Sequence, residues 1–170
     1  MKPEHEPSTA TLRRYHLFRN QISRASSSLF ETYRNHLRCR RGCSYCCDPI
    51  AVLPVEREAI RRWAVRTRYA PNHEPQSGRC ACLQADGACS VYPARPVICR
   101  TFGLPLSYRT YEYDMHGREM VHDPLQYTDL WCDLNFTAIP PDHTAAFFSK
   151  HGRLRMSDIN ERLDALNQDS

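Results

Sequence analysis

The sequence predicts a mainly helical α+β fold with short β-hairpins. Three observations support this prediction: a long helical pattern near the N-terminus, further helical patterns toward the C-terminus, and hairpin signals between them. Hydrophobic residues make up 41% of the 170 residues and charged residues 25%, which is typical of globular proteins. We expect a disordered tail over residues 1–8 and a single domain over residues 9–170, with a cysteine-rich motif at its core in residues 39–103.

The first predicted element is a long helix that leads into the cysteine-rich motif. Apolar residues, several of them aromatic, recur every three or four positions from Leu12 to Leu37, which is the period of a helix with one buried face. Ser8 or Thr9 is the expected N-cap. Such a helix delivers the chain directly to Cys39.

The middle of the chain alternates a helix with loops. Residues 49–53 predict a strand or an extended connector, and Pro54 suits the first turn of a helix from about Val55 to Arg68. A polar, proline-containing loop follows at residues 70–78. Asp86 and Gly87 then form a hairpin signal between residues 82–83 and 89–92.

The remainder is expected to combine short strands with two helices. Residues 95–100 predict one helical turn, and residues 108–115 and 118–122 predict two strands joined through His116 and Gly117. Helices are predicted over residues 142–150 and 157–166, the second beginning at Ser157 or Asp158.

The charge pattern argues against several kinds of partner. The formal net charge is +4, and the arginines are spread along the chain, whereas a nucleic-acid footprint needs basic residues gathered on one face. No apolar run approaches the length of a membrane span, and the polar N-terminus lacks the apolar segment of a secretory signal. We therefore expect a cytoplasmic protein with no membrane partner and no nucleic-acid partner.

Clustered cysteines are the most informative feature of the sequence. Four of the nine cysteines lie within nine residues, in the pattern Cys39-x3-Cys43-x2-Cys46-Cys47. The others are Cys80, Cys82, Cys89, Cys99 and Cys132. In a reducing compartment such a pattern indicates metal binding more than disulfides, and closely spaced thiolates favour zinc or an iron–sulfur cluster.

The number of metal centres stays open at this point. Eight thiols fit two four-cysteine sites, or one cluster with a second metal. A disulfide between the neighbours Cys46 and Cys47 would be strained, so these two thiols are expected to serve two positions of one cluster or two different centres. His36, three residues before Cys39, is the only histidine considered as a substitute ligand.

Three ordered blocks of the sequence resemble the CxxCxxCC cysteine-cluster family, the YkgJ-like zinc- or iron-chelating proteins. The blocks are residues 41–47, with Cys43, Cys46 and Cys47; residues 80–92, with Cys80-x2-Leu83-x5-Cys89-x2-Tyr92; and residues 95–103, with Arg95-Pro96-x2-Cys99-Arg100-x-Phe102-Gly103. The resemblance covers the chain from residue 39 to about residue 103, with Cys132 as a possible last member.

The resemblance implies a set of metal ligands. These are Cys39, Cys43, Cys46, Cys47, Cys80, Cys89, Cys99 and Cys132. It also implies that Arg95 and Arg100 donate hydrogen bonds to backbone carbonyls or to thiolates near the site. The chain departs from the family pattern in the three-residue gap after Cys39, and Cys82 stands outside the implied ligand set.

The leading hypothesis is a metal-binding protein that holds iron, as an iron–sulfur cluster, or zinc. One alternative is an accessory or catalytic component of a protein-modifying enzyme of the lysine-methylase kind, because some larger proteins resembling this family carry out that reaction. The chain has no glycine-rich cofactor loop and no evident nucleophile and base, so we do not expect it to be an enzyme on its own. A thiol-redox enzyme using Cys43 and Cys46 and a zinc-finger-like nucleic-acid module are further alternatives.

Overall fold

A long helix forms the base of the structure, a computed structural model that describes residues 6–40, 42–70, 77–113, 115–116, 119–120 and 126–168. Helix α1 spans Thr9–Thr32, and the Oγ atom of Ser8 caps it by accepting a hydrogen bond from the backbone N–H of Thr11 at 3.1 Å. This confirms the predicted cap. Most of the predicted tail, residues 1–5, lies outside the described residues.

Helix α1 ends earlier than the apolar pattern predicted. The chain leaves the helix after Thr32 and passes through turns over residues 33–36 before it reaches Cys39. Tyr33 is fully buried there, and its hydroxyl donates a hydrogen bond to the backbone carbonyl of Gly152. The apolar period therefore continues past the helix because the turn also packs against the core.

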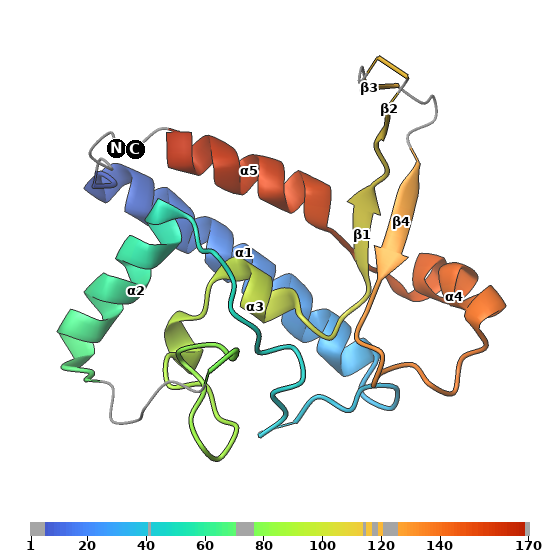
Figure 1. The fold of residues 1–170 in the computed structure, drawn as a ribbon, viewed down its shortest axis with the longest axis horizontal. Coiled ribbons are helices and arrows are strands. Elements are labelled where there is room, and N and C mark those ends of the chain that lie inside the picture. Colours follow the sequence, from blue (N-terminus) through green and yellow to red (C-terminus); the bar gives the residue numbers. More distant parts are fainter. Residues whose placement is uncertain are drawn as a thin grey trace.

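Two further helices lie against α1 and frame the cysteine-rich loops. Helix α2 spans Pro54–Thr67, close to its predicted bounds, and residues 49–53 before it form an extended connector without strand pairing. Most of the loop predicted after α2, residues 71–76, lies outside the described residues. Helix α3 spans Val97–Thr101 and follows the 3-10 turn η1, Tyr92–Ala94. Figure 1 shows α3 crossing α1, with the loops that precede α2 and α3 on the same side of it.

The main sheet is small and contains strands that the sequence did not reveal. Strand β1, Leu106–Arg109, pairs antiparallel with β4, Tyr127–Leu130, and parallel with β5, Leu154–Arg155. The order is therefore β4-β1-β5.

A separate hairpin pairs β2, Glu112–Tyr113, with β3, Glu119–Met120, and extends away from the helices (Figure 1). The predicted pair of strands is thus shorter than expected, since the chain of residues 108–115 divides between two sheets. Gly117, in the predicted turn, lies outside the described residues.

Two C-terminal helices complete the fold, as predicted. A 3-10 turn, η2, spans Pro141–His143, helix α4 spans Thr144–His151, and helix α5 spans Met156–Gln168. The core is formed by the buried faces of α1 and α5 together with residues of the loops and the sheet, and includes Tyr15, Phe148 and Met156, all fully buried. The mainly helical α+β class is confirmed.

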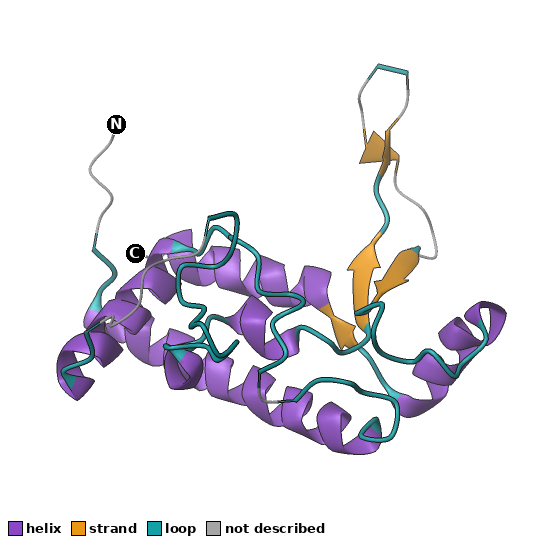
Figure 2. Cartoon of the chain, turned by 60° about the horizontal axis from the view of Figure 1, so that its bottom comes forward, coloured by secondary structure: helices purple, strands orange, loops and turns teal. Residues whose placement is uncertain are grey.

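Irregular segments occupy one side of this helical frame. Figure 2 shows the loops gathered beside the helices, while the strands lie at the other end of the molecule. Among the described residues, no helix is long and apolar enough to cross a membrane.

Candidate metal centre

All nine cysteines are free thiols. Cys99 lies on α3, and the remaining cysteines lie in turns and loops. Cys39 is exposed and the other eight are partly buried. Loops of this kind are held by few backbone pairs, so the contacts around each thiol decide its position.

One group of thiols, here called the first set, comprises Cys39, Cys43, Cys46 and Cys132. A turn closed by the N–H of Cys43 and the carbonyl of Arg40, at 3.0 Å, brings Cys43 back toward Cys39. Cys132 comes from the segment after β4. The first set thus joins a loop near residue 40 to one near residue 132.

Asn135 is the residue that joins these two loops. Its side chain is almost fully buried, and its Oδ1 atom accepts a hydrogen bond from the backbone N–H of Arg38 at 2.7 Å. Its Nδ2 atom donates to the carbonyl of Gly103 at 2.7 Å and to the sulfur of Cys39 at 3.4 Å. Its own N–H donates to the carbonyl of Cys132 at 2.8 Å. One residue therefore positions both ends of the first set, Cys39 through its side chain and Cys132 through its backbone N–H.

Two residues next to this hydrogen-bond network, Phe136 and Gly103, have positive φ angles. Phe136, next to Asn135, has a φ of 58°, which costs free energy for a residue other than glycine. Its N–H donates to the carbonyl of His36 at 2.8 Å, which supports that conformation. Gly103 has a φ of +92°, and a Cβ atom there would lie 2.5 Å from the sulfur of Cys39. The sulfur therefore occupies space that only glycine leaves open.

A second group, here called the second set, comprises Cys47, Cys80, Cys89 and Cys99. The N–H of Cys80 donates to the carbonyl of Cys47 at 3.1 Å, which ties the two segments together. Cys89 pairs with Leu83 in an isolated antiparallel bridge. The predicted hairpin at Asp86 and Gly87 is therefore present as a tight turn with one bridge.

The buried carboxylate of Glu56 holds helix α3, which carries Cys99 of the second set. The Oε1 atom of Glu56, near the start of α2, accepts a hydrogen bond from the N–H of Val97 at 2.9 Å. The hydroxyl of Tyr15 lies 3.5 Å from the same oxygen. Burial raises the pKa of Glu56, while these hydrogen bonds oppose the rise. Glu56 therefore fixes the N-terminus of the helix that carries Cys99.

Arg100 fixes the turn before α3. Its guanidinium donates to the carbonyls of Arg95 and Pro93, each at 2.8 Å, and to the Oγ atom of Ser23 at 3.1 Å. Donation to backbone carbonyls is the role that the family resemblance implied for Arg100. The contact with Ser23 attaches the turn to α1.

The pKa values of the thiols indicate which sulfurs are neighbours. Burial raises the pKa of Cys39, and the charges of Cys132 and Cys43 add to this rise. Burial, with contributions from Cys47, Cys39 and Cys132, raises the pKa of Cys46 to about 11. Each of these thiols is consequently neutral in the metal-free protein at neutral pH.

The second set shows the same pattern. Burial raises the pKa of Cys99 to about 12, with contributions from Cys80, Cys89 and Cys47. Burial also raises the pKa of Cys47, and the charges of Cys80 and Cys89 add to it. The thiols of the second set therefore lie close enough to repel one another when ionised.

Two arginines place positive charge beside the second set. The charge of Arg79 opposes the rise in the pKa of Cys47 that burial causes, and its guanidinium donates a hydrogen bond to the carbonyl of Ser44. The charge of Arg95 opposes the rise in the pKa values of Cys89 and Cys99 that burial causes, and its guanidinium lies 3.8 Å from the ring centroid of Tyr92. The Nε atom of Arg95 is buried without a hydrogen-bond partner among the described residues. A buried N–H of this kind suits a thiolate acceptor better than a neutral thiol.

Cys82 is a neighbour of Cys80 and Cys89, whereas His36 packs against aromatic rings. The Cys82 thiol forms side-chain hydrogen bonds with Cys80 and Ser90, and burial raises its pKa to about 11. The ring of His36 stacks on Phe136, with centroids 6.2 Å apart, and meets Phe147 edge-on at 5.2 Å. Aromatic packing thus accounts for the position of His36.

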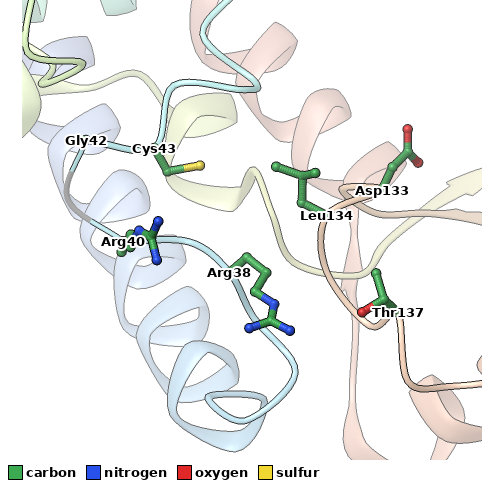
Figure 3. Close-up of a pocket in the computed structure, with 7 residues that line it drawn as sticks. All are labelled: Arg38, Arg40, Gly42, Cys43, Asp133, Leu134 and Thr137. Carbon is green, nitrogen blue, oxygen red and sulfur yellow. The ribbon is translucent and has the colours of Figure 1, made fainter.

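A cavity of about 800 Å³ lies beside the first set. Its lining includes Arg38, Arg40 and Cys43 on one side and Asp133, Leu134 and Thr137 on the other. Figure 3 shows the sulfur of Cys43 directed toward the segment that carries Leu134. Among the described residues, no three cysteine, histidine or acidic side chains converge closely enough to hold a metal ion. The two sets are therefore neighbouring thiols and not finished coordination spheres.

A helical frame that presents clustered free thiols from its loops defines a cysteine-cluster protein. The model of the CxxCxxCC family, described as a putative zinc- or iron-chelating domain, matches residues 38–132. The chain belongs to this family. No curated protein and no solved structure matches the chain.

The matched region covers all nine cysteines and ends at Cys132. It supports metal binding by cysteines as the general activity of the chain. Asn135, three residues beyond the match, is a site residue that sequence reasoning missed. The positioning roles of Glu56 and Gly103 were also missed. Glu56 has no spacing relation to the cysteines, and Gly103, although it lies in the family block of residues 95–103, meets Cys39 only through the fold.

Proposed function

We propose that the protein chelates iron, as an iron–sulfur cluster, or zinc through the thiolates of the first and second sets. The observation that carries this proposal is that eight free thiols lie on four separate segments that the fold links, Cys80 to Cys47 through a backbone hydrogen bond and Cys39 to Cys132 through Asn135. Sulfur-only donor sets are characteristic of zinc and of iron–sulfur clusters.

The donor chemistry fits such a group. Four thiolates around one divalent ion leave about two negative charges, which need nearby positive groups or N–H donors. Arg79 and Arg95 beside the second set supply charge, and the unpartnered Nε–H of Arg95 supplies a donor. Asn135 supplies an N–H donor to Cys39 in the first set.

Binding of this kind requires the loops to close around the metal. The thiols of each set are neighbours in the metal-free chain, and deprotonation with coordination would draw them together. Metal binding would therefore contribute to folding free energy and make the loops more resistant to protease.

A thiol-redox enzyme is less well supported. A reactive cysteine needs a lowered pKa, whereas burial raises the pKa of Cys46 to about 11.

We further propose that residues 9–170 act as one domain in the cytoplasm. The core shared by α1 and α5 and the nine free thiols support these two proposals.

Anaerobic purification followed by analysis for iron, zinc and acid-labile sulfide tests the proposed function. A brown protein that contains both iron and acid-labile sulfide would assign an iron–sulfur protein. A colourless protein with zinc would assign a zinc chelate. A folded protein that takes up neither metal, even after reconstitution, would contradict the proposal.

A further inference from the structure

The adjacent residues Cys46 and Cys47 have different neighbours in the structure. Apart from the neighbouring Cys47, the thiols that interact with Cys46 are Cys39 and Cys132, whereas Cys47 interacts most with Cys80 and Cys89 and less with Cys43. The backbone separates them further, since the carbonyl of Cys47 accepts the N–H of Cys80 at 3.1 Å. The chain thus passes from one set to the other between these two residues.

Each set has its own anchoring contacts. The buried Asn135 side chain holds the first set through Arg38, Gly103 and Cys39. Glu56 holds the second set through the N–H of Val97 at the start of α3. Asn135 follows β4 and Glu56 lies on α2, so the two sets are held by different side chains, although both anchors contact the segment of α3 and the residues just after it.

Each set also has its own group that suits an anionic sulfur. Asn135 Nδ2 donates to Cys39 in the first set, and the charge of Arg95, whose buried Nε has no hydrogen-bond partner among the described residues, acts on Cys89 and Cys99 in the second. Hydrogen bonds from such outer groups commonly orient the ligands of a metal. Two separate donors therefore match two separate centres.

We propose that the chain holds two separate four-thiolate centres, one at Cys39, Cys43, Cys46 and Cys132 and the other at Cys47, Cys80, Cys89 and Cys99, with Cys46 and Cys47 divided between them. This assignment rests on the proposed metal-binding function and specifies it further. Cys82 also interacts with Cys80 and Cys89, and its thiol is hydrogen-bonded to Cys80 and Ser90. We leave it outside both centres because it stands outside the ligand set that the family resemblance implies.

The turn between Cys80 and Cys89 contacts the loop of the first set at two glycines, Gly87 and Gly42. A Cβ atom on Gly87 would lie 2.5 Å from the carbonyl oxygen of Gly42, and Gly87 has a φ of +78°. The turn between Cys80 and Cys89 therefore meets the loop of the first set through a close backbone contact at Gly87 and Gly42. The two centres would be adjacent, with this backbone contact between their loops.

Cobalt titration of the full chain tests the division. Reduced apo-protein is titrated anaerobically with Co²⁺, whose thiolate charge-transfer and d–d absorption bands report tetrahedral sulfur coordination without any enzymatic activity. Wild type is compared with two double variants, Cys39→Ala with Cys132→Ala, and Cys80→Ala with Cys99→Ala. Cys82→Ala is the control, since it removes a cysteine of the same turn.

We expect about two equivalents of Co²⁺ in wild type and in the control, and about one equivalent in each double variant. Combining all four substitutions should remove nearly all thiolate-bound cobalt. Saturation of wild type at one equivalent, or loss of all cobalt from either double variant while it remains folded by circular dichroism, would overturn the division but not the proposed function. Wild type that binds no Co²⁺, Zn²⁺ or iron would overturn both.

Single substitutions of the adjacent pair provide a second test if a double variant does not fold. Cys46→Ala should weaken one centre and Cys47→Ala the other, so each leaves one tight Co²⁺ equivalent. Cys46 and Cys132 belong to the same proposed centre. The double variant Cys46→Ala with Cys132→Ala should therefore keep the same number of tight sites, measured by chelator competition, as the single variant Cys132→Ala. If Cys46→Ala combined with Cys132→Ala loses both tight sites, the division is wrong.

Discussion

Asn135 and Cys39, 96 positions apart in the chain, meet through an N–H to sulfur hydrogen bond of 3.4 Å. The same amide holds the backbone of Arg38 and Gly103, so it fixes the loop around Cys39 and not the thiol alone. The residue is almost completely buried, which makes each of these hydrogen bonds costly to lose.

Replacing Asn135 by alanine should destabilise the apo-protein by about 3 kcal/mol, because a buried N–H and a buried carbonyl lose their partners. Urea unfolding of the reduced protein measures this change. Asn20→Ala, at an exposed position of α1, is the matched control and should change stability by less than about 0.5 kcal/mol. Equal stability of the two variants would show that the amide network does not hold the loop.

Gly103→Ala should displace Cys39, because the new Cβ atom would lie 2.5 Å from its sulfur. Gly78→Ala is a close control: Gly78 also has a positive φ, of +72°, but a Cβ atom there would have no neighbour within 4 Å. Both variants carry backbone strain of about 1 kcal/mol or more. Only Gly103→Ala should also lower zinc affinity, as measured by chelator competition. A loss of affinity in both variants alike would assign the effect to strain.

Glu56→Ala should loosen α3 and the position of Cys99, at a cost of about 1–3 kcal/mol, because the N–H of Val97 loses its acceptor. Glu56→Gln keeps an oxygen at that place and should restore most of the stability. Glu31→Ala, which breaks an exposed pair with Arg34 at 2.8 Å, should cost less than about 0.5 kcal/mol. Thermal unfolding gives the order of stability of the three variants. If Glu56→Gln were as unstable as Glu56→Ala, the role of the hydrogen bond to Val97 would be contradicted.

Alkaline conditions should destabilise the reduced apo-protein. The pKa of Cys46 rises from 9.0 to about 11 on folding, and that of Cys99 to about 12. The folded chain therefore keeps protons that the unfolded chain loses, so this contribution is fully present below about pH 9 and is lost as pH rises toward 12. Urea unfolding at about pH 8 and about pH 10.5 measures the fall. It should be smaller in Cys99→Ala, and an unchanged stability would contradict the raised pKa values.

Metal binding should have the opposite pH dependence, because the metal takes up thiolates and releases their protons. Zinc affinity should rise with pH from about 6 to about 9, and titration in weak buffer near pH 7 should release several protons for each metal bound. Calorimetry in two buffers of different ionisation enthalpy counts those protons. Release of fewer than about two protons per zinc would show that the ligands are not thiols with raised pKa values.

The helices were predictable because each carries its own signal. The apolar period located α1, Ser8 marked its start, and Pro54 marked the start of α2. Strands β4 and β5 were missed because they are short and gain their pairing from β1, far along the chain. A parallel pair of two residues leaves no pattern in the sequence.

Part of the candidate site was likewise predictable from the sequence, and part was not. Spacing selected the cysteines as candidate ligands, and that selection remains a prediction. It could not say which thiols are neighbours, since Cys132 reaches Cys39 only through the fold. Asn135, Gly103 and Glu56 act through buried contacts with distant backbone, and such contacts have no local signature.

The contacts of Asn135 also affect the order in which the two cysteine sets can form during protein synthesis. A ribosome releases residues from the N-terminus at about 5–20 per second, so the loop at Cys39 is exposed for several seconds before Asn135 follows it. Residues 47–99 can assemble earlier, since Cys47, Cys80, Glu56 and Val97 all lie within that stretch. During synthesis the first set, which needs both Cys132 and Asn135, is therefore completed later than the second set.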